Sequence, residues 1–261
     1  MKPRGWLEAA AFAISLLGLV GLLARPPRLA HAFGDEGVFH PRPLLTGRST
    51  LQGVRATAPA RWSRELVNRT SAPARLTPVA VRADDDALLA EPFAYFLGEG
   101  PLAPLTASEI GHLRRFFAQG GILLVDDAGP ETGIFGQQAR REIARVLPDA
   151  APVPIGTEHV IFRSFYFLRR PVGRVEGPPK LEAIVRAGTA QVIFSSHDLG
   201  GALAQSETGL FSLAVTPNGE QQRERAIRLA VNIAMYVLCS NYKDDQVHEQ
   251  YLMRRRASGA P

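Results

Sequence analysis

The sequence contains a single cysteine, Cys239, among its 261 residues. An intrachain disulfide is therefore excluded. Cys239 closes the stretch AIRLAVNIAMYVLC, in which apolar residues occupy nearly every helical position. A reactive thiol is the functional interpretation, but a cysteine in such a stretch is typical of a small buried side chain. We expect Cys239 to be buried, and its place near the end of the last predicted helix makes it a poor nucleophile.

The motifs of the common enzyme classes are also missing. The chain has no HExxH, no GxSxG, no Walker loop and no GxGxxG after a strand. Each of these motifs places a metal ligand, a nucleophile or a phosphate-binding loop in a defined structural context. Without them, the sequence carries no signature of a particular reaction.

Positive charge is in excess, but little of the excess lies outside the N-terminus. The formal net charge is +5 and the pI is near 9.8. The first 32 residues hold four basic residues and one acidic residue, so 26 basic and 24 acidic residues remain in the rest of the chain. A domain so nearly balanced, with scattered arginines, lacks the basic stripe of a phosphate-backbone reader. We expect no nucleic-acid partner.

Only one long apolar run occurs, and it begins close to the N-terminus. The basic MKPR precedes a run of 16 residues from Ala9 to Ala24, and LAHA offers a cleavage site before Phe33. As a helix this run rises about 24 Å, short of the roughly 30 Å hydrocarbon core of a membrane. We expect residues 1–32 to be a signal peptide or, if uncleaved, a membrane anchor, with a buried core helix as the third alternative. Either membrane interpretation places the remaining chain outside the cytoplasm, in the periplasm or anchored and facing it.

The rest of the chain can bury one sizeable core. Hydrophobic residues make up 46% of the sequence, which excludes disorder as the main state. Residues 33–60 are rich in Gly, Pro, Arg and Thr and are predicted to be an extended lead-in with one strand-like stretch around 38–45. Residues 61–239 are predicted to form the domain, and residues 240–261 a polar tail that is frayed or helical.

Helix and strand patterns alternate along residues 61–239. The helix over 105–121 is the best specified, because Thr106 and Glu109 have the spacing of a capping box and two glycines end it. Strands are predicted over 76–81, 93–98, 122–127, 158–168, 181–188 and 189–196, and further helices over 60–70, 136–147 and 223–238. Strands joined through helices and short loops pair in parallel. We therefore expect an α/β fold with a doubly wound, mainly parallel sheet.

Polar loops follow three of the predicted strands. In an open parallel sheet, ligands bind beyond the carboxyl ends of the strands. The loops contribute these candidate pocket residues: Gly98, Glu99 and Gly100; Asp126 and Asp127; and Ser196, His197 and Asp198. Because the three loops should meet at one edge of the sheet, we expect them to form one pocket.

The paired aspartates allow two interpretations. Asp126 and Asp127 point to opposite faces if the strand continues, so only one of them can face a given site. They could act as turn or cap residues, or one could coordinate a cation or serve as an acid or base. His159 and His197 would complete a set suited to zinc or another divalent metal if the fold brought them together. Asn232, alone in an apolar stretch, is expected to form hydrogen bonds within the core.

The order and spacing of several blocks resemble a known bacterial family. The blocks are FAYFLGEGPLAPLTASEIGHLRRFFAQGGILLVDDAG, REIARVLPD, EHVIFRSFYFL, VIFSSHDLGGAL and AVNIAMYVL. Together they resemble the domain of unknown function 4159, which is similar to the class I glutamine amidotransferase-like superfamily. The resemblance covers about residues 61–238 and implies a flavodoxin-like three-layer sandwich.

The chain departs from the pattern that this resemblance implies. Catalytic amidotransferases carry a nucleophilic cysteine on an elbow after the strand that corresponds to 122–127, whereas this chain has Ala128 after its paired aspartates. The family pattern has a histidine where Glu99 stands, and a Gly-Asp-Trp-Tyr-like stretch near the first helix is missing here. The matching positions are Asp126, Asp127, His159, Asp198 and Gly200. Glutaminase chemistry therefore has no visible nucleophile.

These observations favour a non-catalytic, exported ligand-binding or scaffold domain of the cell envelope. Its expected partners are a small molecule or an envelope protein, and the membrane at the N-terminus if residues 1–32 remain attached. The alternative is a metal- or carboxylate-dependent hydrolase that uses the Asp126/Asp127 and His159/His197 loops, with a divalent metal as its cofactor. A structural envelope protein without a pocket is the third interpretation.

Overall fold

Seven strands form one sheet within residues 37–257, the part of the chain that the computed structural model describes, with side chains described up to residue 240. The strand order is β2-β1-β3-β4-β7-β6-β5. The strands are β1 (Arg42–Leu45), β2 (Val81–Arg82), β3 (Phe93–Gly98), β4 (Ile122–Asp127), β5 (Val153–Ile155), β6 (Leu181–Arg186) and β7 (Thr189–Ser195). The predictions for residues 1–32, including the hydrophobic targeting helix, lie outside the described residues.

The sheet is mainly parallel, as predicted. Strands β2, β1, β3, β4 and β7 pair in parallel, and β6 and β5 extend the sheet beyond β7 in antiparallel pairing. Two residues connect β6 to β7, and both have positive φ: 49° at Ala187 and 81° at Gly188. Such a loop matches the twist of an antiparallel hairpin. The mainly parallel sheet, together with the helices of the chain, confirms the predicted mixed α/β fold class.

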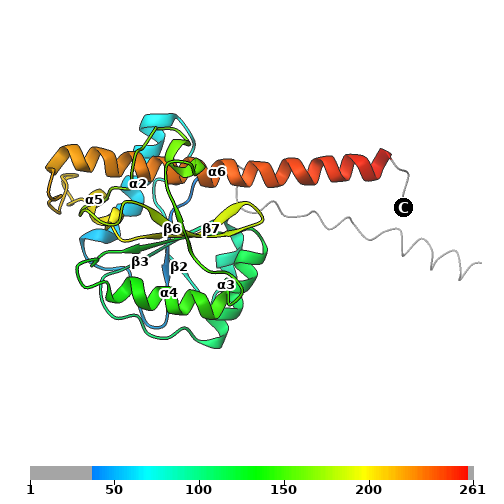
Figure 1. The fold of residues 1–261 in the computed structure, drawn as a ribbon, viewed down its shortest axis with the longest axis horizontal. Coiled ribbons are helices and arrows are strands. Elements are labelled where there is room, and N and C mark those ends of the chain that lie inside the picture. The colour runs from blue at the N-terminus through cyan, green and yellow to red at the C-terminus, as the bar shows by residue number, and fades with distance from the viewer. Residues whose placement is uncertain (1–36, 258–261) are drawn as a thin grey trace, which may run out of the picture. The chain divides into compact units, whose positions relative to one another are not determined.

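Helices cover both faces of the sheet (Figure 1). Helices α2, α5 and α6 pack with the short η3 on one face, and α3 and α4 pack on the other. The α-helices are α2 (Ala58–Thr70), α3 (Ala107–Ala118), α4 (Ile134–Val146), α5 (Leu199–Leu203) and α6 (Gly219–Ala257), and the 3-10 helices are η1 (Val54–Thr57), η2 (Asp86–Ala90) and η3 (Val160–Arg163). Because both faces are buried, the central strands are continuous apolar runs rather than alternating ones.

Alternate residues of the central strands face the two cores. In β3, Phe93 and Tyr95 face the core under α2 and α6, whereas Phe96 faces the core under α3 and α4. Trp62 of α2 fills the first core: its ring centroid lies 5.7 Å from that of Phe93 and 5.5 Å from that of Tyr95. Its indole N–H donates to the Ala230 carbonyl of α6 at 2.8 Å, so the ring is buried with its polar atom satisfied.

The capping box predicted for α3 is confirmed. The Thr106 hydroxyl accepts from the Glu109 N–H at 3.2 Å, and the Glu109 carboxylate accepts from the Thr106 N–H at 2.7 Å. The second Glu109 oxygen accepts from the Gly47 N–H at 2.6 Å. A local helix signal therefore also fixes a loop that lies 62 residues earlier in the chain.

The lead-in predicted over residues 33–60 is, from residue 37 on, part of the domain. It supplies β1 between β2 and β3, then η1 and the start of α2. The Arg42 side chain anchors β1 from within the sheet, because its guanidinium donates to the carbonyls of Ala87, Leu88 and Glu91 at 2.7, 3.0 and 2.8 Å. The strand-like stretch predicted around 38–45 contains β1, but the composition did not indicate that this strand would lie inside the sheet with a buried arginine.

The strand predicted over 158–168 is wrong. These residues form η3 and an extended loop, because side chains rather than a neighbouring strand satisfy the backbone. His159 Nδ1 accepts from the Ile161 N–H at 3.3 Å. Asn232 accepts from the Tyr166 N–H at 2.7 Å and donates to the carbonyls of Tyr166 and Ile161, both at 2.8 Å. The prediction that Asn232 forms hydrogen bonds in the core is confirmed.

The expectation for Cys239 is wrong as well, because its side chain is exposed. Helix α6 turns Ala230, Ala234 and Val237 toward the sheet. At 100° per residue, Cys239 lies on the opposite side of the helix. Within the described residues, no helix has both the length and the apolar content to cross a membrane.

Candidate functional site

The carboxyl ends of the parallel strands bring the predicted loops to one edge of the sheet. Gly98 of β3 pairs with Asp127 of β4, and Asp126 of β4 pairs with Ser195 of β7. The loops that carry Glu99, the paired aspartates and Asp198 therefore start side by side. The register of β3, β4 and β7 decides which side chains of these loops can contact one another.

Asp126 is fully buried and fixes the start of α5. The N–H groups of Leu199 and Gly200 donate to its carboxylate at 3.0 and 2.8 Å, and the Tyr95 hydroxyl donates at 2.8 Å. A Cβ on Gly200 would lie only 2.4 Å from the Tyr95 oxygen, so a glycine is needed at this close approach. Burial, with repulsion from Asp198, raises the pKa of Asp126 to about 7 although the three hydrogen bonds oppose the shift.

We expect Asp126 to make the protein less stable as the pH rises. An unfolded aspartate has a pKa of about 3.9. The stabilising proton is therefore fully bound below about pH 4 and is lost from the folded chain as the pH rises through about 7. The measurement is the free energy of unfolding by denaturant, for the wild type and for Asp126→Asn, between about pH 4 and about pH 7. Over this range the wild-type value should fall relative to that of Asp126→Asn, by at most about 1.4 kcal/mol per pH unit. A difference that is independent of pH would contradict the protonation of buried Asp126.

Asp127 points to the other face of the sheet, as the alternation predicts. Its carboxylate accepts from the N–H groups of Gly129 and Gly136 at 3.1 and 3.3 Å. A Cβ on Gly136 would lie 2.5 Å from this carboxylate. Burial raises the pKa of Asp127, and these two hydrogen bonds act against the shift. Asp127 thus joins the glycine-rich loop to the first turn of α4, which is the turn and cap role.

Asp198 is the centre of an ion-pair cluster that links three distant segments. It is fully buried, has a φ of 52° and caps α5, accepting from the Gly201 N–H at 2.8 Å. The Arg55 guanidinium binds both of its oxygens, with Nε and Nη2 at 2.9 and 2.7 Å. Arg174 binds the same carboxylate through its Nε. Two arginines compensate one buried charge, which a lone carboxylate in such a place would not tolerate.

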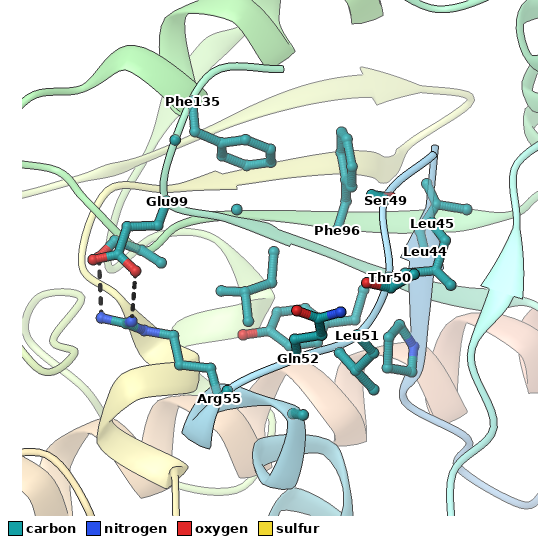
Figure 2. A pocket seen from close by; sticks show the side chains of 18 of the residues that line it. Leu44, Leu45, Ser49, Thr50, Leu51, Gln52, Arg55, Phe96, Glu99 and Phe135 are labelled. Carbon is teal, nitrogen blue, oxygen red and sulfur yellow. Dashed lines mark hydrogen bonds and ion pairs between the residues drawn. The ribbon is translucent and has the colours of Figure 1, made fainter. Parts of the chain in front are cut away.

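Arg55 also reaches the predicted Gly-Glu-Gly loop. Its Nη1 lies 3.0 Å from a Glu99 oxygen, and its Nη2 donates to the Ala128 carbonyl at 3.3 Å. The Glu99 side chain is 66% exposed, so the Arg55–Glu99 pair lies on the solvent side of the cluster. Solvent screens the attraction between these two charges. Figure 2 shows Arg55 and Glu99 facing each other across the end of a cavity.

This cavity has a volume of about 330 Å³. It lies between the loop after β1 and the loop after β3, with the rings of Phe96 and Phe135 on one side and Leu51 and Gln52 on the other (Figure 2). From β1 the chain goes outward to β2 and then returns past β1 to β3, so the strand order reverses between β1 and β3. In open α/β sheets, ligands bind in the crevice at such a reversal.

The predicted pocket residues divide into two groups. Gly98, Glu99 and Gly100 line the cavity. The other predicted residues lie outside its lining: Asp126, Asp127, His159, Ser196, His197 and Asp198. The aspartates of this second group shape the loops around the cavity through the hydrogen bonds described above.

The two histidines are not brought together with the aspartates around one ion. His197 is buried under the segment that holds Gly173 and Gly177; its Nε2 lies 3.0 Å from the Pro178 carbonyl, and burial lowers its pKa to about 4. The His159 ring packs 5.7 Å from the ring of Tyr236 in α6. Among the residues with described side chains, no three His, Cys, Asp or Glu groups are placed to hold one metal ion. The predicted His/carboxylate metal set is not formed there.

Sequence reasoning did not find Arg55, Arg174 or Tyr95. Arg55 lies in the stretch treated as a lead-in, and Arg174 lies in a loop without a recognisable motif. Asp198 is separated from Arg55 by 143 residues and from Arg174 by 24, so no local spacing connects them. A buried aspartate needs a compensating basic partner, but local sequence does not identify which arginine supplies it.

Comparison with known proteins identifies the family. The model of the family described as "Domain of unknown function (DUF4159)" matches residues 44–238, a range that begins inside β1 and ends inside α6. A comparison with curated proteins finds no match. The matched part is well over half of the 261 residues. The chain therefore belongs to the DUF4159 family.

Proposed function

We propose that this protein is a non-catalytic, exported domain of the cell envelope and that, of the two roles expected for it, ligand binding or scaffold, it binds a small molecule. The single observation that carries the binding function is the cavity of about 330 Å³ at the reversal of strand order between β1 and β3. Its volume falls within the range of about 300–1,000 Å³ that is typical of ligand pockets. The export signal predicted in residues 1–32 supports the envelope location.

The lining suggests the chemistry of the ligand. Phe96, Phe135 and Leu51 offer apolar surface, and Gln52 with the Arg55–Glu99 pair offers polar groups at one end. Arg55 and Glu99 are the charged residues of the lining and have opposite signs, so the cavity favours a ligand of low net charge. We infer a compact molecule with an apolar body and one polar end.

We also propose that the domain is a flavodoxin-like three-layer sandwich of the glutamine amidotransferase-like type. The parallel strands follow the order 2-1-3-4 with β7 in fifth place, and helices lie on both faces, which supports this layering. The antiparallel strands β5 and β6 would be an addition at one edge. At the elbow after β4, where an amidotransferase nucleophile would stand, Ala128 is buried and its N–H donates to the Gly98 carbonyl at 2.8 Å. This arrangement supports binding rather than glutaminase chemistry.

We expect a tryptophan at Thr50, an exposed residue of the cavity lining, to block ligand entry. Saturation-transfer NMR with a library of neutral aromatic fragments should detect binders of the full-length wild type. Their affinity should fall at least about tenfold in Thr50→Trp, because the indole would occupy space that the fragment needs. Thr157→Trp is the matched control, since Thr157 is also exposed but lies outside the lining. Fragments that bind Thr50→Trp as well as the wild type would show that this cavity is not the binding site.

The hydrolase alternative keeps one observation in its favour. The pKa of Asp126, raised to about 7, is suited to proton transfer at neutral pH. Its side chain is buried, however, and both oxygens already accept hydrogen bonds. Elemental mass spectrometry of the full-length protein before and after incubation with zinc or manganese separates the two proposals: stoichiometric metal that is lost in Asp126→Asn would favour the hydrolase.

A further inference from the structure

The segment 163–170, which begins at the last residue of η3, places aromatic and basic side chains in solvent. Every second side chain from Arg163 on is exposed: Arg163, Phe165, Phe167 and Arg169. Phe167 is 91% exposed and Phe165 is 43% exposed. The residues between them, Tyr166 and Leu168, pack against the core. We call Arg163, Phe165, Phe167 and Arg169 the aromatic-basic ridge.

The ridge is held firmly rather than carried on a loose loop. Asn232, buried in α6, uses its carbonyl oxygen and both amide hydrogens to bind the Tyr166 N–H and the carbonyls of Tyr166 and Ile161. The Leu168 N–H donates to the Phe162 carbonyl at 2.8 Å. A buried amide with all three bonds directed at one segment fixes the backbone on which the two phenylalanines stand. Exposed aromatic rings on a fixed backbone are typical of an interaction site.

The charge around these rings is positive. Neither the Arg163 nor the Arg169 guanidinium has a carboxylate partner among the residues whose side chains are described. The acidic Glu224 nearby is already bound by Arg69 and Arg228, at 2.8 Å each. The Arg228 guanidinium lies over the Tyr166 ring, 5.1 Å from its centroid. Within the part of the chain whose side chains are described, the two ridge arginines therefore remain available to an anionic partner.

We propose that the aromatic-basic ridge docks on the surface of an anionic lipid bilayer. Phenylalanines that enter the headgroup region, with arginines beside them, are the usual composition of peripheral membrane contacts. Each arginine near an anionic surface contributes about 1 kcal/mol of attraction. The ridge is one short segment with an exposed arginine at each end and two exposed rings between them, which suits a layer of negative headgroups. This inference does not depend on the cavity or its ligand.

The test uses the full chain and a reporter on the ridge, because residues 1–32 are themselves predicted to associate with membranes. Phe167→Cys in a Cys239→Ser background carries a nitrobenzoxadiazole label, whose fused aromatic rings take the place of the phenyl ring. The probes are vesicles of phosphatidylcholine alone and of phosphatidylcholine with phosphatidylglycerol. The same label at Val79→Cys, in an exposed loop before β2, is the matched control.

We expect a blue shift and quenching by doxyl-labelled lipid at position 167 only with phosphatidylglycerol, and no such change at position 79. Replacing Arg163 and Arg169 by glutamine should weaken the affinity for the anionic vesicles, measured by the label at position 167, about fivefold for each arginine. The corresponding pair Arg141→Gln/Arg186→Gln, from exposed positions elsewhere, should leave it unchanged.

Four results would overturn the proposal. One is the same response at positions 167 and 79, which would report only insertion of the N-terminus. Another is an unchanged response in Arg163→Gln/Arg169→Gln, or a response to phosphatidylcholine alone. A blue shift that grows with protein concentration in the absence of vesicles would assign the ridge to contact with a second copy of the chain.

Discussion

Replacing Asp198 with alanine is expected to lower the free energy of unfolding by about 3–5 kcal/mol, because it leaves two arginines without their buried partner. The lost carboxylate binds Arg55 and Arg174 and caps α5 through the Gly201 N–H. Urea unfolding followed by far-UV circular dichroism measures this change. The loop after β1 and the segment around Arg174 should also lose hydrogen-exchange protection, because Asp198 ties them to β7.

Two variants serve as controls for Asp198. Asp198→Asn retains a side-chain oxygen for capping and tolerates the positive φ of 52°, so it should cost less than the alanine variant. Asp86→Ala removes a carboxylate that is 80% exposed in its ion pair with Arg115, and it should change stability by at most about 1 kcal/mol. If Asp198→Ala behaved like Asp86→Ala, the cluster would not hold these segments together.

Replacing Asn232 with leucine is expected to lower the free energy of unfolding by about 3 kcal/mol or more. The substitution keeps the volume but leaves the Tyr166 N–H and the carbonyls of Tyr166 and Ile161 without their partner. Each buried backbone group left unsatisfied costs about 1–3 kcal/mol. Denaturant unfolding measures the total, and faster exchange of the Tyr166 amide locates it in segment 163–170.

The control for Asn232 is Asn68→Leu on the exposed side of α2, which should stay within about 0.5 kcal/mol of the wild type. An Asn232→Leu protein with wild-type stability and an unchanged Tyr166 amide would show that water or a local shift replaces the lost bonds. In that case the ridge would not depend on α6 for its position.

Much of the central sheet could be predicted from the sequence because its signals are local. The strands over 93–98 and 122–127 are the residues of β3 and β4, since continuous apolar runs bounded by glycine or acidic residues are what a strand buried on both faces requires. The capping box of Thr106 and Glu109 placed the start of α3. The alternation of Asp126 and Asp127 followed from strand geometry alone.

The parts that could not be predicted depend on contacts between distant residues. The strand-like stretch around 38–45 was recognised, but nothing near it indicates that Arg42 would find three carbonyls around η2, about 45 residues later, and so anchor β1 inside the sheet. Segment 158–168 has a strand-like pattern, but Asn232, 66 residues beyond Tyr166, supplies the hydrogen bonds that a neighbouring strand would have supplied. The cavity was missed in part for the same reason, because one of its walls is the loop after β1.

The most direct test of the binding function is a map of backbone amide shifts in the full-length protein titrated with the tightest fragment. If the cavity between β1 and β3 is the site, the shifted amides will lie in residues 46–56 and 97–102, and Thr50→Trp will abolish the shifts. Shifts that instead centre on Asp126, Asp127 and His197 would contradict the proposed site and move the search to the buried carboxylates.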